Sequence, residues 1–276
     1  ACLEESGRCA MKCPWFCKIL CLLVALSWAG PVAARTIRVC INDRSAPPYT
    51  YPDREGLGQE LLRKAIEQQG DTMVVTPLPW RRCLESVRAG ENEVPLMGSP
   101  SEFVRGLADF PMKGGEPDES RAISSANLVV FVRKDGGVTW DGQAFGGLST
   151  PVAYGSGIAV VREKLERLGV TGEEGLNLHE QIGKLLFYRK VQAGVVRETV
   201  AKTLLHDNPD FRPVLQILPV PFLVDNSYAP FNKAFAQANP AYVEAVWNAI
   251  GAQRARPEWA RRERAAVEAI IEGRER

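Results

Sequence analysis

Residues 76–111 read TPLPWRRCLESVRAGENEVPLMGSPSEFVRGLADFP, and this stretch decides the fold of the chain. It predicts a strand that ends at Trp80, a helix over 81–89 closed by Gly90, and a second strand over 93–97. Glycine often ends a helix because it adopts the left-handed backbone conformation without steric cost. A strand, a helix and a strand in this order form one unit of a parallel α/β sheet.

The same alternation continues along the rest of the chain. Strands are predicted over 36–41, 72–78, 126–133, 151–154, 193–196 and 212–218, and helices over 58–69, 157–168, 178–187, 197–206, 240–253 and 257–272. The helices have apolar residues at a period of 3.6, which indicates one buried face for each. The sequence therefore predicts a layered α/β protein.

The spacing after the second strand of the opening stretch resembles family 3 of the bacterial extracellular solute-binding proteins. In that family a strand ending in Pro-Trp leads into a helix and then into a strand that runs into a glycine. An arginine seven residues after this glycine grips the carboxylate of the ligand, and Gly98 and Arg105 keep this spacing. The resemblance covers roughly residues 36–250. It implies the type 2 periplasmic binding fold, in which two α/β lobes, each a mixed and mostly parallel sheet flanked by helices, are joined by two crossing strands that act as a hinge.

The resemblance also implies how the chain divides. The expected parts are a leader over 1–34, a first part of lobe 1 over 35–131, lobe 2 over 132–227, and a return to lobe 1 with C-terminal helices over 228–276. The outward crossing strand is expected near 126–133 and the return strand near 225–231.

The N-terminal segment has the features of a secretory signal peptide. Basic residues after Met11 precede an apolar run over 19–29, and small residues before Arg35 predict cleavage at that point. The alternative is a membrane anchor, but the run is shorter than the ~20 residues that a spanning helix needs. Residues 1–10 precede Met11 and are expected not to be native. The sequence therefore predicts an exported, periplasmic protein.

Removal of this leader would change the cysteine count and the charge. Of the seven cysteines only Cys40 and Cys83 would remain, and the formal net charge would fall from +1 to zero. Two cysteines in an exported chain favour a disulfide, with two buried free thiols as the alternative. A neutral chain gives no indication of binding to nucleic acid.

Two groups of lobe 1 residues are ligand-binding candidates. Arg105 presents a planar guanidinium that matches a carboxylate, although a surface arginine paired with a nearby acid is the alternative. The resemblance places the ring of Tyr49 on the apolar part of the ligand. Trp80 is a candidate for a second wall, and packing of the loop is the alternative for both. Gly98 and Ser99 complete the lobe 1 candidates.

Lobe 2 contributes a small-residue loop and an arginine. Gly155, Ser156 and Gly157 follow a strand and open a helix, whose first amides favour an anion, although any tight strand-to-helix turn needs small residues. Arg197 stands where amino-acid binders carry an acid for the ligand's ammonium group, and a shift of one residue in the alignment would bring Glu198 there. With Arg197 in place, the sequence predicts an acidic or uncharged polar solute over a cationic one.

The predicted function is capture of a small, carboxylate-bearing, amino-acid-like solute by a monomer that serves an ABC permease in the cytoplasmic membrane. No catalysis, cofactor or metal is predicted, since the two histidines, His179 and His206, are not clustered with other ligand types. One alternative is a ligand-sensing module for a signalling partner. Another is an enzyme of the cyclohexadienyl dehydratase type, with Glu198 or Glu102 as general acid.

Overall fold

The computed structural model describes residues 34–156, 158–175 and 178–274. The described residues from Thr36 onward form one compact unit. The predicted signal peptide lies outside the described residues. Within the described ranges, no helix is both long enough and apolar enough to cross a membrane.

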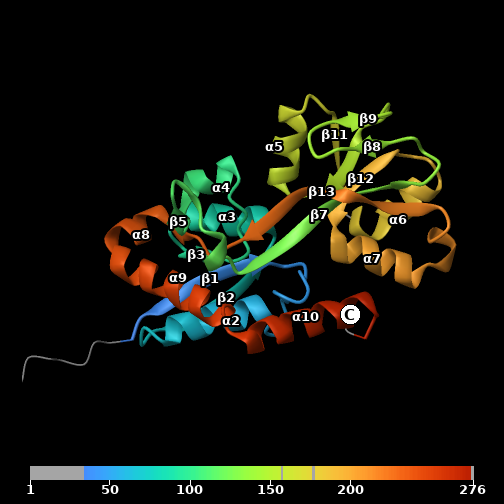
Figure 1. Cartoon of the computed structure of the whole chain (residues 1–276). Helices are drawn as coiled ribbons and strands as arrows, with labels where there is room; N and C mark the ends of the chain where they lie inside the picture. Colours follow the sequence, from blue (N-terminus) through green and yellow to red (C-terminus); the bar gives the residue numbers. More distant parts are fainter. Residues whose placement is uncertain (1–33, 157, 176–177, 275–276) are drawn as a thin grey trace, which may run out of the picture. The chain divides into compact units, whose positions relative to one another are not determined.

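The first sheet has three parallel strands in the order β2-β1-β3 (Figure 1). These strands are β1 (Thr36–Asn42), β2 (Thr72–Leu78) and β3 (Val94–Pro95), and they are connected by α2 (Leu57–Glu67) and α3 (Trp80–Arg88). The strand predicted over 93–97 is shorter than expected. The reason is the left-handed backbone of Met97, with φ of 71°, which cannot continue a strand.

Three C-terminal helices return to this sheet: α8 (Lys233–Ala238), α9 (Pro240–Arg254) and α10 (Pro257–Ile271). The core between sheet and helices includes Ile37 and Val39 from β1, Leu62 from α2, and Trp247 and Ile250 from α9. Each helix buries only the face that carries its apolar residues, as the period of 3.6 predicts.

The second sheet has five strands in the order β11-β10-β12-β7-β13. The strands are β7 (Ser124–Arg133), β10 (Val152–Gly155), β11 (Gly172–Gly175), β12 (Ala193–Arg197) and β13 (Leu215–Ser227), and the helices are α5 (Ala159–Arg167), α6 (Leu178–Phe187) and α7 (Glu198–Asp207). β10, β11 and β12 are parallel, and β7 runs antiparallel to β12 and β13. Two apolar cores contain buried residues of its strands.

β7 and β13 are the long strands that run from one sheet to the other (Figure 1). They pair from Ser124 and Ser227 onward into the second sheet. A strand over 212–218 and a separate return strand near 225–231 were expected, but the structure has one strand, Leu215–Ser227. Its register shifts near Pro221, because a proline lacks the N–H group that a ladder needs and is accommodated at a bulge.

The lobe limits at residues 131 and 227 stay a prediction. Packing favours an earlier first limit, near Ser124. Ile123 lies in the core of the first sheet, whereas Leu128 and Val130 lie in a core of the second.

Several short elements were not predicted. They include α4 (Glu102–Leu107), β11, α8, the strand pairs β4 (Ala108–Asp109) with β14 (Phe231–Asn232), β5 (Met112–Lys113) with β6 (Glu116–Pro117) and β8 (Thr139–Trp140) with β9 (Phe145–Gly146), and two 3₁₀ turns, Glu119–Arg121 and Pro209–Phe211. α4 begins at Ser101, whose hydroxyl accepts a hydrogen bond from the Val104 amide at 3.3 Å. Such a side-chain cap satisfies one of the free amides of a helix start.

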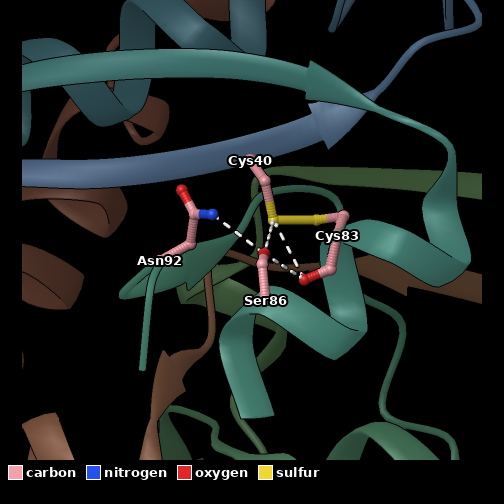
Figure 2. Close-up of a disulfide and its surroundings, with 4 residues drawn as sticks. All are labelled: Cys40, Cys83, Ser86 and Asn92. Carbon is pink, nitrogen blue, oxygen red and sulfur yellow. Dashed lines mark hydrogen bonds between the residues drawn. A yellow bond between two sulfur atoms is a disulfide. The ribbon is translucent and has the colours of Figure 1, made fainter. Parts of the chain in front are cut away.

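A disulfide joins Cys40 of β1 to Cys83 of α3, which confirms the predicted pairing (Figure 2). Their Cα atoms lie 5.6 Å apart, within the usual range for a disulfide, and both residues are fully buried. Beside the bridge, Asn92 donates a hydrogen bond to the Ser86 hydroxyl at 2.8 Å, and this hydroxyl donates to the Cys83 carbonyl at 2.8 Å. The disulfide therefore links α3 covalently to β1, the central strand of the first sheet.

Candidate functional site

Four of the candidate residues lie at the ends of strands, or in the loops after them, in both sheets. Tyr49 lies in the loop after β1, Ser99 in the loop after β3, Gly155 at the end of β10 and Arg197 at the end of β12. Parallel strands bring such loops to the carboxyl edge of a sheet, where open α/β sheets bind their ligands. Gly157 lies outside the described residues.

The contacts at this edge centre on Asp225, a residue of β13 that the sequence analysis did not select. The Ser99 hydroxyl donates a hydrogen bond to Oδ1 of Asp225 at 2.7 Å. Nη2 of Arg197 donates to Oδ2 of the same carboxylate at 3.3 Å. Ser99 follows a strand of the first sheet and Arg197 ends a strand of the second, so one carboxylate links the two sheets. We call Ser99, Asp225 and Arg197 the bridging cluster.

Burial makes this cluster energetically important. The side chain of Asp225 is 2% exposed and that of Arg197 is 26% exposed. A carboxylate removed from water is costly unless a countercharge and hydrogen bonds compensate it. Arg197 and Ser99 supply both. The sequence did contain a signal for Asp225. This acid directly follows the apolar residues of the segment VPFLVD, 220–225, and an acid next to a run of apolar residues is a candidate for a buried, paired carboxylate.

The contact with Asp225 corrects one premise of the sequence analysis. That analysis took Arg197 as a permanent positive charge beside the ligand, whereas in the structure the Asp225 carboxylate, 3.3 Å from Nη2 of Arg197, offsets this charge. The predicted preference for acidic or uncharged solutes loses its basis.

Glu198, the alternative acid at this position, has its own partners. Lys202 forms an ion pair with it at 2.7 Å, and Asn127 donates a hydrogen bond to it at 2.8 Å. The bond from Lys202 is the main reason why the pKa of Glu198 lies below its ordinary value. A lowered pKa opposes a role as general acid, because a general acid must hold its proton near the working pH.

Tyr49 is only 6% exposed, so most of its ring contacts protein. Its hydroxyl donates a hydrogen bond to Glu263 of α10 at 2.9 Å. Burial first, and then the charge of Glu263, raises the pKa of this hydroxyl well above its ordinary value. The charges of Arg254 and Arg197 act in the opposite direction, so both cations lie within electrostatic range of Tyr49.

Arg105 lies on α4, beside the first sheet. Its Nε donates a hydrogen bond to the Pro100 carbonyl at 2.8 Å, and its Nη2 lies 3.9 Å from the Glu116 carboxylate. It lines a cavity of about 420 Å³ together with Ala108, Asp109, Phe110, Met112, Ala236, Pro240, Val243, Glu244 and Trp247. All of these residues belong to segments that pack beside the first sheet. In the part of the chain that the structure describes, no hydrogen bond or ion pair joins Arg105 to the bridging cluster.

Trp80 and Gly98 contact other parts of the protein core and backbone. Trp80 opens α3 and packs beside the disulfide. The backbone of Gly98 exchanges hydrogen bonds of 3.1 and 2.9 Å with Tyr228. A Cβ atom on Gly98 would lie 2.9 Å from Cγ of Pro230, closer than side-chain contacts allow, so only glycine fits there.

The anion site predicted in the loop after β10 stays a prediction, because Gly157 lies outside the described residues. Gly155 is buried, and the amide of Ser156 donates to the Gly175 carbonyl at 3.1 Å instead of pointing freely at a ligand. α5 begins at Ala159, two residues after Gly157.

A second contact between the two sheets' sides of the molecule is a hydrogen bond between α4 and α5. The backbone amide of Glu102, at the start of α4, donates a hydrogen bond to the carboxylate of Glu163 from α5 at 3.2 Å. A carboxylate at a helix start is favoured by the helix dipole and by the free amides there. Across the described ranges, no group of three or more histidine, cysteine, aspartate or glutamate side chains could hold a metal ion.

No family model and no curated protein matches the sequence. Solved structures do match. The amino acid ABC transporter substrate-binding protein AbpA from Streptococcus pneumoniae, solved with L-arginine, has a TM-score of 0.62 at 20% identity, over 86% of this chain and 96% of that one. A Salmonella typhimurium periplasmic binding protein of high arginine specificity has a TM-score of 0.59 at 13% identity, over 85% and 100%. An ancestral amino-acid-binding protein, a precursor of cyclohexadienyl dehydratase, has a TM-score of 0.54 at 16% identity, over 86% and 94%.

At 13 to 20% identity, the similarity to these proteins concerns the fold alone. The two sheets and the two long strands between them are consistent with that fold. The chain has the two-lobed α/β fold of the amino acid ABC transporter substrate-binding proteins.

Proposed function

We propose that the protein captures a small, amino-acid-like solute between its two lobes and delivers it to an ABC permease. The observation that carries the proposal is the bridging cluster, in which Ser99, Asp225 and Arg197 come from the first sheet, a crossing strand and the second sheet. Polar and charged groups that converge from both lobes are what a ligand needs if its binding is to favour closure. The proteins of similar fold that bind L-arginine support the same reading.

The proposed mechanism is closure of the lobes about β7 and β13. The segments at Ser124 and Ser227, where the cores change from one sheet to the other, would serve as the hinge. A ligand shifts the population toward the closed state only as far as it binds that state better. The proposal includes export by residues 1–34, a periplasmic location and a monomeric protein.

Within this proposal, Arg197 replaces Arg105 as the group that takes the carboxylate of the ligand. Arg197 uses one described N–H donor on Asp225, and a guanidinium has five. Its remaining donors are available in a side chain that is 26% exposed. Tyr49, in the loop after β1, would form part of the wall of the site.

A dehydratase activity is the weaker candidate. The ancestral protein of similar fold is a precursor of cyclohexadienyl dehydratase. The lowered pKa of Glu198 works against it as the acid of such a reaction.

A thermal-shift screen tests the proposal. Amino acids, dicarboxylates, amines and sugars are added to the purified protein, and a bound ligand raises Tm by mass action. We expect at least one amino acid to raise Tm and to titrate by calorimetry. Arg197→Ala should abolish this binding, and Arg81→Ala is the matched control, because Arg81 is 92% exposed and pairs only with Glu85 in the described contacts. A screen in which no solute raises Tm would overturn the proposal.

A further inference from the structure

We infer that one edge of the second sheet is a docking surface for a membrane, namely for a bilayer that contains anionic lipids. At this edge β7 ends and β12 and β13 begin, so it lies opposite the end of β12 that carries Arg197. We call its exposed residues the basic edge, and they are Lys134, Lys184, Tyr188, Arg189, Lys190 and Arg212. The inference goes beyond the proposed function, because this surface is separate from the bridging cluster.

Hydrogen bonds hold the three turns of this edge together. Nη2 of Arg189 donates to the Asp135 carboxylate at 2.5 Å, which joins the turn after α6 to the turn after β7. The Lys134 ammonium donates to the Arg212 carbonyl at 2.7 Å, and the Lys134 amide donates to the Val214 carbonyl at 2.9 Å. These two bonds join the turn after β7 to the segment before β13. The basic edge is therefore one connected surface rather than a set of independent loops.

This edge carries a surplus of positive charge in a chain that is balanced as a whole. The basic residues of its turns are Arg133, Lys134, Lys184, Arg189, Lys190 and Arg212, and the acidic ones are Asp135, Asp207 and Asp210. Six positive against three negative charges leave a surplus of three. The formal net charge of residues 35–276 is zero, so negative charge elsewhere balances this surplus. Each basic side chain near an anionic membrane contributes to attraction over about one Debye length.

Tyr188 is an independent observation at the same edge. It is 67% exposed, the highest value among the exposed large hydrophobic residues of the described ranges. The ring of Phe187 supports it edge-on, with the ring centroids 5.3 Å apart and the planes at 84°. Tyrosine is enriched where membranes meet water, because its ring enters the apolar region while its hydroxyl stays among the headgroups. An exposed tyrosine among lysines and arginines therefore has the chemistry of an interfacial anchor.

The composition of the basic edge favours lipid over a protein partner. A stable protein interface needs about 800 Å² on each side and a well-fitted centre. Five of the six residues of the basic edge are instead long lysine and arginine side chains, placed around one exposed ring. Lipid headgroups are mobile and respond to charge rather than to shape, so such side chains attract them without a fitted pocket.

The first test is sedimentation with lipid vesicles. The protein is residues 35–276, because the described residues from Thr36 onward form one compact unit and the apolar run of the leader would itself bind lipid. One set of vesicles is phosphatidylcholine alone, and the other has equal parts of phosphatidylcholine and phosphatidylglycerol. We expect sedimentation with the second set only, and a partition coefficient that falls about 10-fold or more between about 20 and 500 mM salt.

Two outcomes of this test would overturn the inference. One is no sedimentation with the anionic vesicles at the lower salt concentration, even if the acidic polypeptide poly-L-glutamate binds, since that result would indicate a protein partner. The other is equal sedimentation with both sets of vesicles, since attraction to anionic lipid would then play no part.

The second test uses variants in the same assay. Lys184→Gln combined with Lys190→Gln should lower the partition coefficient about 10-fold or more, and Tyr188→Ala should lower it about fivefold. The matched control is Arg261→Gln combined with Arg264→Gln, which removes the same charge from the exposed face of α10. Equal losses in the control and in the lysine variant would mean unspecific attraction and would overturn the inference. Circular dichroism checks that each variant is folded.

Discussion

Arg105 and Arg197 look alike in the sequence, as two arginines near the ends of strands, yet they occupy different environments. Arg197 ends β12 and contacts the buried carboxylate of Asp225 at 3.3 Å. Arg105 lies on α4, and its nearest acid is the exposed Glu116 at 3.9 Å. A guanidinium in contact with a buried charge is coupled to the fold, whereas an exposed pair at this distance contributes little. The spacing of a motif can select an arginine as a candidate. Its role depends on which residue, distant in the sequence, the folded chain places beside it.

The largest expected effect concerns the disulfide that holds α3, the helix beside the Arg105 region. The Cys40–Cys83 bridge spans a sequence separation of 43 residues and holds α3, which packs against α4. Replacing both cysteines by serine should lower the free energy of unfolding by about 4 kcal/mol in the chain-entropy model. Urea denaturation measures this loss, and a reductant should reproduce it in the wild type.

Ligand affinity should survive in the folded serine variant, because the bridging cluster does not touch the disulfide. A large loss of affinity would show that the two regions are coupled. An unchanged free energy of unfolding would show that the bridge does not form in solution.

The next effect concerns Arg197 itself. Arg197→Ala should destabilise the protein by about 3 kcal/mol, because Asp225 would keep a buried charge without its countercharge. Adding Asp225→Asn should restore part of this loss. The two single variants and the double variant, compared by urea denaturation, give the coupling energy between the two side chains. Additive effects would contradict a direct interaction.

A smaller effect concerns α10, which packs against α7 beside the second sheet and is joined to α2 of the first. Arg262 donates hydrogen bonds to Glu60 and, as the largest cause, lowers the pKa of Glu60 from 4.5 to about 2. A carboxyl group whose pKa is lower in the folded state stabilises above its unfolded pKa. This stability is lost as the pH falls from about 4.5 toward 2.

Glu60→Gln should therefore cost about 1 kcal/mol at pH 7, since Arg262 is half exposed and solvent screens the pair. The cost should shrink as the pH falls through this range and be small at pH 2. Urea denaturation at both values checks this. An equal cost at both values of pH would assign the effect to packing rather than to charge.

The smallest effect is expected for Arg105. Arg105→Ala should change the free energy of unfolding by no more than about 0.5 kcal/mol, as for most exposed residues. It should also leave amino-acid affinity nearly unchanged. The family resemblance predicts the opposite, a complete loss of binding, so one calorimetric titration decides between the motif and the position. Leu107→Ile, a neighbouring and conservative change on α4, serves as the control for disturbance of the helix.

The sequence by itself determined most of the regular elements and the disulfide. The strand over 72–78 and the helix over 178–187 have the predicted bounds, because their patterns are regular and depend only on neighbours in the chain. Cys40 and Cys83 were the two cysteines outside the leader, so their pairing followed from a short argument.

Only the tertiary structure decided the roles of the site residues. Asp225 is 126 residues from Ser99 and 28 from Arg197, and nothing local in the chain relates the three. Their contact depends on the crossing of β7 and β13 and on the ends of strands from two sheets. Likewise, Arg105 lies on α4 and lines a cavity with residues of α8 and α9, which its distance from Gly98 in the chain does not reveal. The periodicity that predicts a helix or a strand is a property of residues that are neighbours in the chain. The site is built from residues that are distant in the chain, and only folding brings those residues together.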